Sequence, residues 1–137
     1  MLDQTDWEIL RWLRQDSRMQ WKEIGLKVHM TGQAVAARIR KMEDLGIIES
    51  FTVSLGPGKL GRPVTAFITV FMKTTDHQGF EGFLAETEAV AGAHRISGDG
   101  CYQLEVNVTD QQELNSILED ILKYGNYRIN LSIGRIK

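Results

Sequence analysis

The residues best suited to chemistry lie between Gly32 and Met42, where three cations occur with no acid. In a helix that turns Val35 and Ile39 inward, other side chains form the opposite, outer face. That face comprises Gln33, Ala37, Arg40, Lys41 and Asp44, with Arg38 on its flank. Glutamine and arginine match adenine and guanine edges in the major groove, and cations neutralise phosphates. The pattern predicts a surface that binds DNA.

Two short helices joined by a tight corner must position this surface. Ile24 and Val28 stand four residues apart, and a Met-Thr-Gly corner precedes the second apolar series of Val35, Ile39 and Met42. Thr31 is a suitable N-cap because its hydroxyl can accept a hydrogen bond from the first turn, and Gly46 suits the end of the helix. The pattern predicts a helix-turn-helix, completed by a first helix over Asp3–Gln15.

The outer face alone also fits an ordinary solvated helix surface, since arginine and lysine are good helix formers. The preceding helix, the corner and the following segment GIIESFTV favour the DNA-binding interpretation. We expect GIIESFTV to form a strand, the wing or hinge of a winged helix. Trp7 and Trp12 flank the apolar stripe of the first helix. Their side chains are expected either to cover the core or a dimer contact, or to stack on a nucleic-acid base.

Composition fits a small regulator better than a large enzyme. The chain has 137 residues, a net charge of −2 and 42% hydrophobic residues, which supports a folded core and argues against general coating of nucleic acid. Its one cysteine precludes an internal disulfide. Without a long apolar run or a secretory signal pattern, we expect a cytoplasmic protein with no membrane partner.

The second half alternates strand and helix patterns after a Gly- and Pro-rich stretch at Leu55–Pro63. We expect strands over 64–73, 93–98, 101–108 and Tyr127–Ile136, and helices over His77–Val90 and Gln111–Tyr124. The order βαββαβ predicts a ferredoxin-like α+β domain, a four-stranded antiparallel sheet with both helices on one face. The expected divisions are 1–51 for DNA binding, 52–63 for the linker and 64–137 for oligomerisation and an effector.

The strand at 64–73 has apolar residues on both faces, because Ala66 and Ile68 alternate with Phe67 and Phe71. An antiparallel sheet with one solvated face would carry polar residues there. A homodimer joined through these domains is therefore expected. The alternative is a single buried aromatic side chain with no partner.

The whole chain resembles the Lrp/AsnC, or feast/famine, family of transcriptional regulators. The matching segments are LDQTDWEILRWLRQDSRM, EIGLKVHMTGQAVAARIRKMEDLGIIESF and ISGDGCYQLEV. The resemblance implies a winged helix-turn-helix joined to a regulator-of-amino-acid-metabolism domain, dimers that assemble into rings such as octamers, double-stranded promoter DNA as partner, and an amino-acid effector. By position, the residues expected to approach DNA are Thr31, Gln33, Ala34, Ala37, Arg38, Arg40 and Lys41.

The effector half departs from the family pattern, which commonly has Gly, a variable residue, an aromatic and then Asp. Here the run is Gly98, Asp99, Gly100, Cys101, Tyr102. Asp99 could hold an ammonium group, and the neighbouring backbone amides could receive a carboxylate. The alternative is a tight turn that uses Asp-Gly for its backbone angles. A different ligand, or none, is compatible with the altered positions.

Other chemical groups give weak patterns. His29, His77 and His94 are scattered with no second ligand at metal spacing, so we expect neither a metal site nor a cofactor. Cys101 with His94 makes a poor nucleophile pair, and no enzyme is predicted. Alternatives to a local regulator are a nucleoid-type protein that wraps DNA with little sequence preference, and a small-molecule-binding or enzymatic module.

Overall fold

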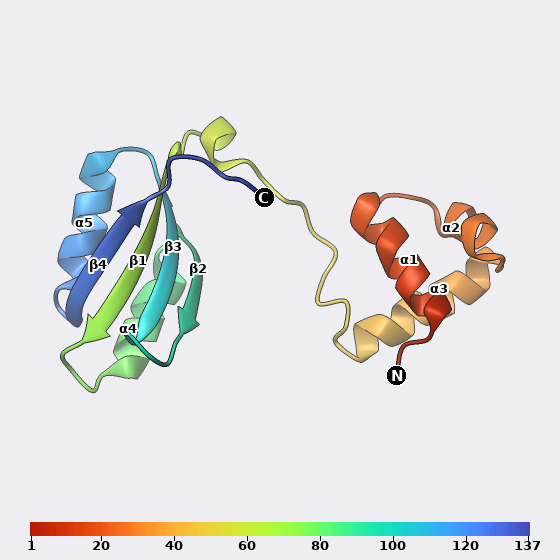
Figure 1. Cartoon of the computed structure of the whole chain (residues 1–137), viewed down its shortest axis with the longest axis horizontal. Helices are drawn as coiled ribbons and strands as arrows, with labels where there is room; N and C mark the ends of the chain where they lie inside the picture. The colour runs from red at the N-terminus through yellow and green to blue at the C-terminus, as the bar shows by residue number, and fades with distance from the viewer. The chain divides into compact units, whose positions relative to one another are not determined.

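The computed structural model describes all residues from Met1 to Lys137. The chain divides into two compact units, Met1–Ser54 and Leu55–Lys137. The first unit contains three α-helices, and the second contains a four-stranded sheet with two α-helices (Figure 1). No helix has the length and apolar character needed to cross a membrane.

The first unit consists of α1 (Gln4–Gln15), α2 (Trp21–Val28) and α3 (Gly32–Asp44). Each helix contributes apolar side chains at helical spacing to one core. Three short helices together bury apolar surface that no one of them could bury alone. The buried members are Ile9, Leu13, Ile24, Val28, Val35, Ile39 and Met42. The inward series predicted for α3 is confirmed, with Val35 and Ile39 fully buried and Met42 1% exposed.

Local signals begin and end these helices where the sequence predicted. Thr31 accepts a hydrogen bond from the Ala34 N–H at 3.1 Å, which caps α3. At the other end, Gly46 has φ of +73°, and the Ile47 N–H donates to the Met42 carbonyl at 2.9 Å. This is a Schellman ending, in which a left-handed glycine satisfies carbonyls of the last turn.

The strand expected for GIIESFTV is absent, and this prediction was wrong for the single chain. Residues 46–53 form a turn followed by irregular backbone. Between Glu49 and Leu55 the backbone makes no hydrogen bond with the rest of the chain. A strand requires a neighbouring strand to satisfy its backbone groups, and the first unit contains none.

The second unit has a short 3-10 turn, η1 (Pro57–Leu60), before its sheet. The elements then follow as β1 (Val64–Met72), α4 (His77–Glu86), β2 (Val90–Arg95), β3 (Tyr102–Val108), α5 (Gln111–Ile121) and β4 (Gly125–Leu131). The strands are antiparallel in the order β2-β3-β1-β4. Side chains of both helices and the inner face of the sheet form one core. The predicted ferredoxin-like α+β fold is confirmed.

The boundaries of one helix and two strands differ from expectation. The helix expected to reach Val90 ends at Glu86, because the backbone turns extended at Thr87 and Val90 pairs with Val106 of β3. The second strand therefore lies over 90–95 instead of 93–98. The last strand begins two residues before Tyr127, at Gly125, and ends at Leu131, which pairs with Ala66 of β1.

The open face of the sheet is more polar than β1 alone suggested. Phe67 pairs with Glu105 and Asn130, and Phe71 pairs with Asn126, so polar residues of the neighbouring strands share their face. Phe67 is 37% exposed. The apolar character of this face is concentrated at β1, in the two phenylalanines.

Candidate nucleic-acid interface

A close backbone approach sets the corner between α2 and α3. A Cβ atom at Gly25 would collide with the carbonyl oxygen of Met30, whose N–H donates to the Gly25 carbonyl at 2.8 Å. His29 ends α2 in the left-handed conformation, with φ of +60°. A Cβ at Gly32 would lie 3.2 Å from the Lys22 Cα, so the start of α3 lies against the start of α2. The absence of a side chain at Gly25 therefore sets the orientation of α3 relative to α2.

The predicted outer face of α3 is the exposed face. Gln33, Ala37, Arg40 and Lys41 are exposed, as is the capping residue Thr31. Neither Arg40 nor Lys41 forms an ion pair within the chain. Ala34 is half-buried, with its N–H held by Thr31. The helix thus presents an amide, a small residue and two unpaired cations to solvent.

Arg38 differs from the other cations of α3. Its Nη1 lies 2.6 Å from both carboxylate oxygens of Asp3 and 3.0 Å from Oδ1 of Asp6. These acids form the capping box of α1, in which each carboxylate also accepts a backbone N–H of the other residue. The Arg38 side chain therefore ties α3 to the start of α1, and a phosphate contact would compete with this ion pair.

The ion pair changes the ionisation of its members in the expected directions. The Arg38 hydrogen bond, with help from the Asp6 backbone N–H, lowers the pKa of Asp3 from 3.8 to about 2. Hydrogen bonds to Asp3 and then Asp6 raise the pKa of Arg38. Both shifts favour the charged pair over its neutral form. Sequence reasoning missed this contact because 35 residues separate its partners.

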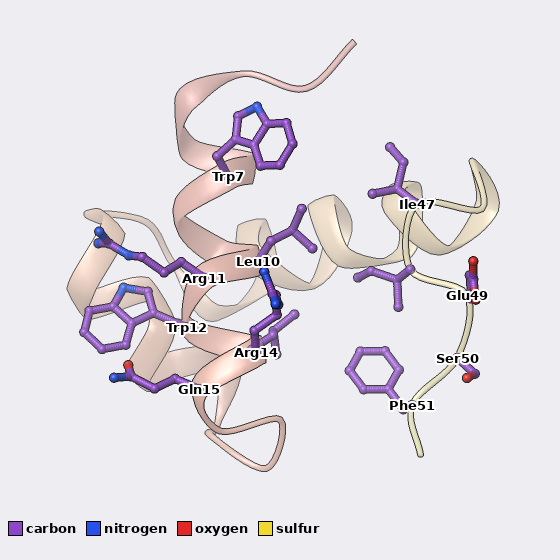
Figure 2. A pocket seen from close by; sticks show the side chains of 12 residues that line it. Trp7, Leu10, Arg11, Trp12, Arg14, Gln15, Ile47, Glu49, Ser50 and Phe51 are labelled. Carbon is purple, nitrogen blue, oxygen red and sulfur yellow. The ribbon is translucent and has the colours of Figure 1, made fainter. Parts of the chain in front are cut away.

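An apolar groove of about 1080 Å³ lies elsewhere in the first unit, between α1 and residues 47–51. Figure 2 shows Leu10 facing this segment and Phe51 across the gap, with Trp7 near the start of α1. None of the predicted DNA-binding residues lines the groove. Trp12 packs at the edge of the core, and the Lys27 ammonium lies 4.4 Å from its ring centroid. Trp7 is 60% exposed.

The turn at 98–101 was predicted as an effector site. In the structure its residues contact other residues of the same chain. Gly98 and Gly100 have φ of +105° and +104°, and a Cβ at Gly100 would lie 2.5 Å from the Thr69 methyl. Asp99 pairs with Arg128 of β4 at 3.0 Å. The Cys101 N–H donates to the Val70 carbonyl at 2.7 Å. The four residues come together as a tight turn closed by these contacts.

A partly buried polar contact lies behind β3, on the side of α4. The Tyr102 hydroxyl donates to Oε2 of Glu81 at 2.6 Å, and Nδ1 of His77 lies 2.8 Å from the same hydroxyl. Burial, followed by the Glu81 hydrogen bond, raises the pKa of Tyr102 to about 12. No group of three or more His, Cys, Asp or Glu residues is placed to hold a metal ion.

Two family models together cover most of the chain. The AsnC-type helix-turn-helix domain matches residues 2–43, and the Lrp/AsnC ligand binding domain matches residues 65–137. The HTH-type transcriptional regulator LrpB of Bacillus subtilis is 48% identical over 136 residues, which are 99% of this chain and 91% of LrpB. LrpA of the same organism is 35% identical over 98% of this chain and its own full length.

Solved structures share the fold over the full chain. The structure of B. subtilis LrpC superposes with a TM-score of 0.95 at 27% identity, covering 100% of this chain and 98% of LrpC. A transcriptional regulator of Neisseria meningitidis in complex with L-Met gives a TM-score of 0.91 at 24% identity, covering 100% of this chain and 93% of its own.

Proposed function

Because this chain belongs to the Lrp/AsnC family of HTH-type transcriptional regulators, we propose that the outer face of α3 is its sequence-reading surface. The single observation that carries this proposal is the exposed set Gln33, Ala37, Arg40 and Lys41 on a helix whose opposite side is buried. Arg40 and Gln33 offer paired hydrogen-bonding groups to base edges, and Ala37 permits close approach. The resemblance predicted from sequence is confirmed.

Phosphate binding completes the proposed interface. Lys41 and the Thr31 hydroxyl suit phosphate oxygens, because the Thr31 oxygen accepts the Ala34 N–H while its own hydrogen remains free to donate. Ala34 would approach the backbone of DNA without reading bases. Arg38 would contribute a phosphate contact only by giving up Asp3 and Asp6, so we rank it below Arg40 and Lys41.

We propose a homodimer that places two α3 helices in successive major grooves, about 34 Å apart. Its support is apolar surface with no partner in the chain: Phe67 on the open sheet face, and Phe51, Val53 and Leu55 in the segment whose backbone is unpaired. A second chain would supply the missing hydrogen bonds and cover these side chains. Assembly of dimers into an octamer is part of the same proposal.

We propose that an amino acid modulates DNA binding in the cytoplasm, without catalysis. The second unit matches a ligand-binding domain, and the L-Met complex of the N. meningitidis regulator directs the choice of ligand class to test. An effector must bind one assembly or one spacing of helices more tightly than another.

The test is a mobility-shift titration on the upstream region of the protein's own gene against random DNA of equal length. Preferential retardation of the upstream fragment is expected, and a shift on adding amino acids would identify the effector class. Equal retardation of both fragments would contradict the sequence-reading proposal and favour an architectural protein that wraps DNA. Sedimentation equilibrium of the same sample tests the dimer, which a monomer at micromolar concentration would contradict.

A further inference from the structure

His29, in the corner between α2 and α3, has a backbone conformation that glycine normally adopts. Its φ and ψ are +60° and +46°, in the left-handed region where a side chain crowds the following carbonyl. Every other residue of the chain with positive φ is a glycine: Gly46, Gly61, Gly98 and Gly100. Position 29 is therefore the one place where the chain combines this conformation with a side chain.

The corner itself imposes the conformation. The N–H groups of His29 and Met30 both donate to the Gly25 carbonyl, the second at 2.8 Å. A Cβ at Gly25 would collide with the Met30 carbonyl oxygen, so glycine is required at that position. The turn of a helix-turn-helix often contains glycine, which would adopt the conformation of His29 without strain. The histidine at 29 therefore needs an explanation other than the shape of the corner.

The His29 imidazole does not stabilise the first unit through a contact of its own. It is exposed, and it does not belong to the side chains packed against the core of this unit. It forms no hydrogen bond and no ion pair within the chain. A strained residue whose side chain has no partner in the fold points to a role in binding.

The position of His29 indicates what it binds. It precedes Thr31, the N-cap of α3, by two residues. A recognition helix enters the major groove with its N-terminal residues on the base edges, so the residues just before the N-cap lie near the phosphates at the groove rim. The first six residues of α3, 32–37, carry no charge. Lys27, two residues before His29, has its ammonium over the Trp12 ring.

We propose that the His29 side chain is a further DNA contact, whose ring N–H donates to a phosphate oxygen at the rim of the groove that α3 enters. Imidazole carries at least one N–H donor, and a hydrogen bond to an anionic oxygen is stronger than one to a neutral acceptor. Phosphate contacts fix the position of a protein on DNA without reading sequence. The proposal rests on the proposed reading surface of α3.

His29→Gly separates strain from binding, because it relieves the backbone and removes the imidazole. We expect a higher urea midpoint in tryptophan fluorescence and, by fluorescence anisotropy, an affinity for DNA about three- to tenfold lower. The loss should be equal on the upstream fragment and on random DNA. Unchanged affinity, or a loss confined to the upstream fragment, would overturn the phosphate contact. A lower urea midpoint would also overturn it, by assigning the side chain to the fold.

His29→Lys tests rescue, because lysine also donates to phosphate while keeping a side chain in the left-handed conformation. It should bind both DNAs at least as tightly as the wild type. Affinity as low as that of His29→Gly would contradict the contact. The matched control adds His94→Lys to His29→Gly, which places the same charge at an exposed position of β2. Recovery of affinity in this double variant would assign the effect to net charge and overturn the contact at position 29.

Gly46→His measures the strain independently. It places the same side chain at φ of +73°, where an added Cβ meets nothing within 4 Å. The urea midpoint of the first unit should fall. An unchanged midpoint would show that this conformation costs histidine nothing, and the inference would lose its basis.

The wild type separates this proposal from the proposed function. DNA binding by the wild type that is unchanged in His29→Gly removes the His29 contact and leaves the reading surface of α3 standing. No binding of either DNA by the wild type would contradict both.

Discussion

The outer face of α3 and the 98–101 turn differ in whether their charged groups are already paired within the chain. Arg40 and Lys41 are exposed and form no ion pair. Asp99 holds Arg128, and Gly100 packs against Thr69. Both regions carried predicted binding residues, yet only the first leaves its charges available. A candidate contact residue must therefore be judged by what it already binds.

Within α3 itself, Arg38 is paired within the chain whereas Arg40 is not. It lies three residues after Val35 and two before Arg40, but its guanidinium is held by Asp3 and Asp6. Its residue type and its position in the sequence predicted a DNA contact. In the structure its side chain instead links α3 to the start of α1. Substitutions in the two regions separate the groups that stabilise each unit from the groups that remain free to bind.

The largest effect is expected from Gly25→Ala. The added methyl meets the Met30 carbonyl, so we expect a loss of about 1–3 kcal/mol in the stability of the first unit and loss of DNA retardation. All three tryptophans, Trp7, Trp12 and Trp21, lie in this unit, so their fluorescence during urea unfolding reports on it.

Gly82→Ala, in the second unit, is the control for that experiment. Its added methyl meets nothing within 4 Å on a helix surface, so it should leave both the tryptophan unfolding transition of the first unit and DNA binding unchanged. Equal stability of Gly25→Ala and wild type would show that the corner is not fixed by this contact.

Gly100→Ala should destabilise the second unit by about 1–3 kcal/mol, because a side chain at φ of +104° is strained and meets the Thr69 methyl. Thermal unfolding followed by circular dichroism measures the loss. Adding Thr69→Ser removes that methyl while keeping the hydroxyl that donates to Gln103. Partial recovery in the double variant is expected, and no recovery would assign the whole cost to backbone strain.

Lys41→Ala should weaken binding to the upstream fragment and to random DNA by a similar factor. Because one phosphate contact is lost, the slope of log affinity against log salt should fall by about one. Fluorescence anisotropy across a salt series gives this slope. An unchanged slope would exclude Lys41 from the phosphate contacts.

A smaller effect, present at neutral pH and fading as the solution becomes acid, is expected from Arg38→Ala. The pKa of Asp3 is lowered from 3.8 to about 2 by the ion pair, so its contribution to stability is present above about pH 4 and lost as pH falls toward 2. The variant should unfold more easily at neutral pH and depend less on pH in this range. Parallel pH profiles for variant and wild type would contradict the ion pair.

Asp99→Asn should have the smallest effect, below about 1 kcal/mol, because both partners of its ion pair are mostly exposed. Thermal unfolding at low and high salt measures it. A loss well above this value would mean that the pair, and not the glycines, holds the 98–101 turn.

The sequence predicted those features that depend on local spacing. Periodicity identified the inward series of α3, and turn chemistry identified Thr31 and Gly46 as its ends. Contacts between distant residues were missed, such as Arg38 with Asp3, because side-chain type does not encode a partner 35 residues away. The start of β2 was misplaced because helix propensity around Ala89 yields to pairing with β3.

The character of the open sheet face could not be predicted from the sequence of one strand alone. The pattern of β1 indicated two apolar faces, but pairing brings Glu105, Asn126 and Asn130 beside its phenylalanines. Cross-strand neighbours, set by register, determine the character of a face. The strand predicted at 46–53 is absent for a related reason. Without a partner strand, a segment with a strand pattern stays irregular.

The most direct test compares Arg40→Ala with Arg38→Ala in competition between the upstream fragment and random DNA, at a salt concentration and temperature where both variants are folded. We expect Arg40→Ala to lose about 1–3 kcal/mol of affinity for the upstream fragment and most of its preference over random DNA. Arg38→Ala should keep that preference. Retained preference in Arg40→Ala, with loss in Arg38→Ala, would contradict the division between free and paired cations on α3.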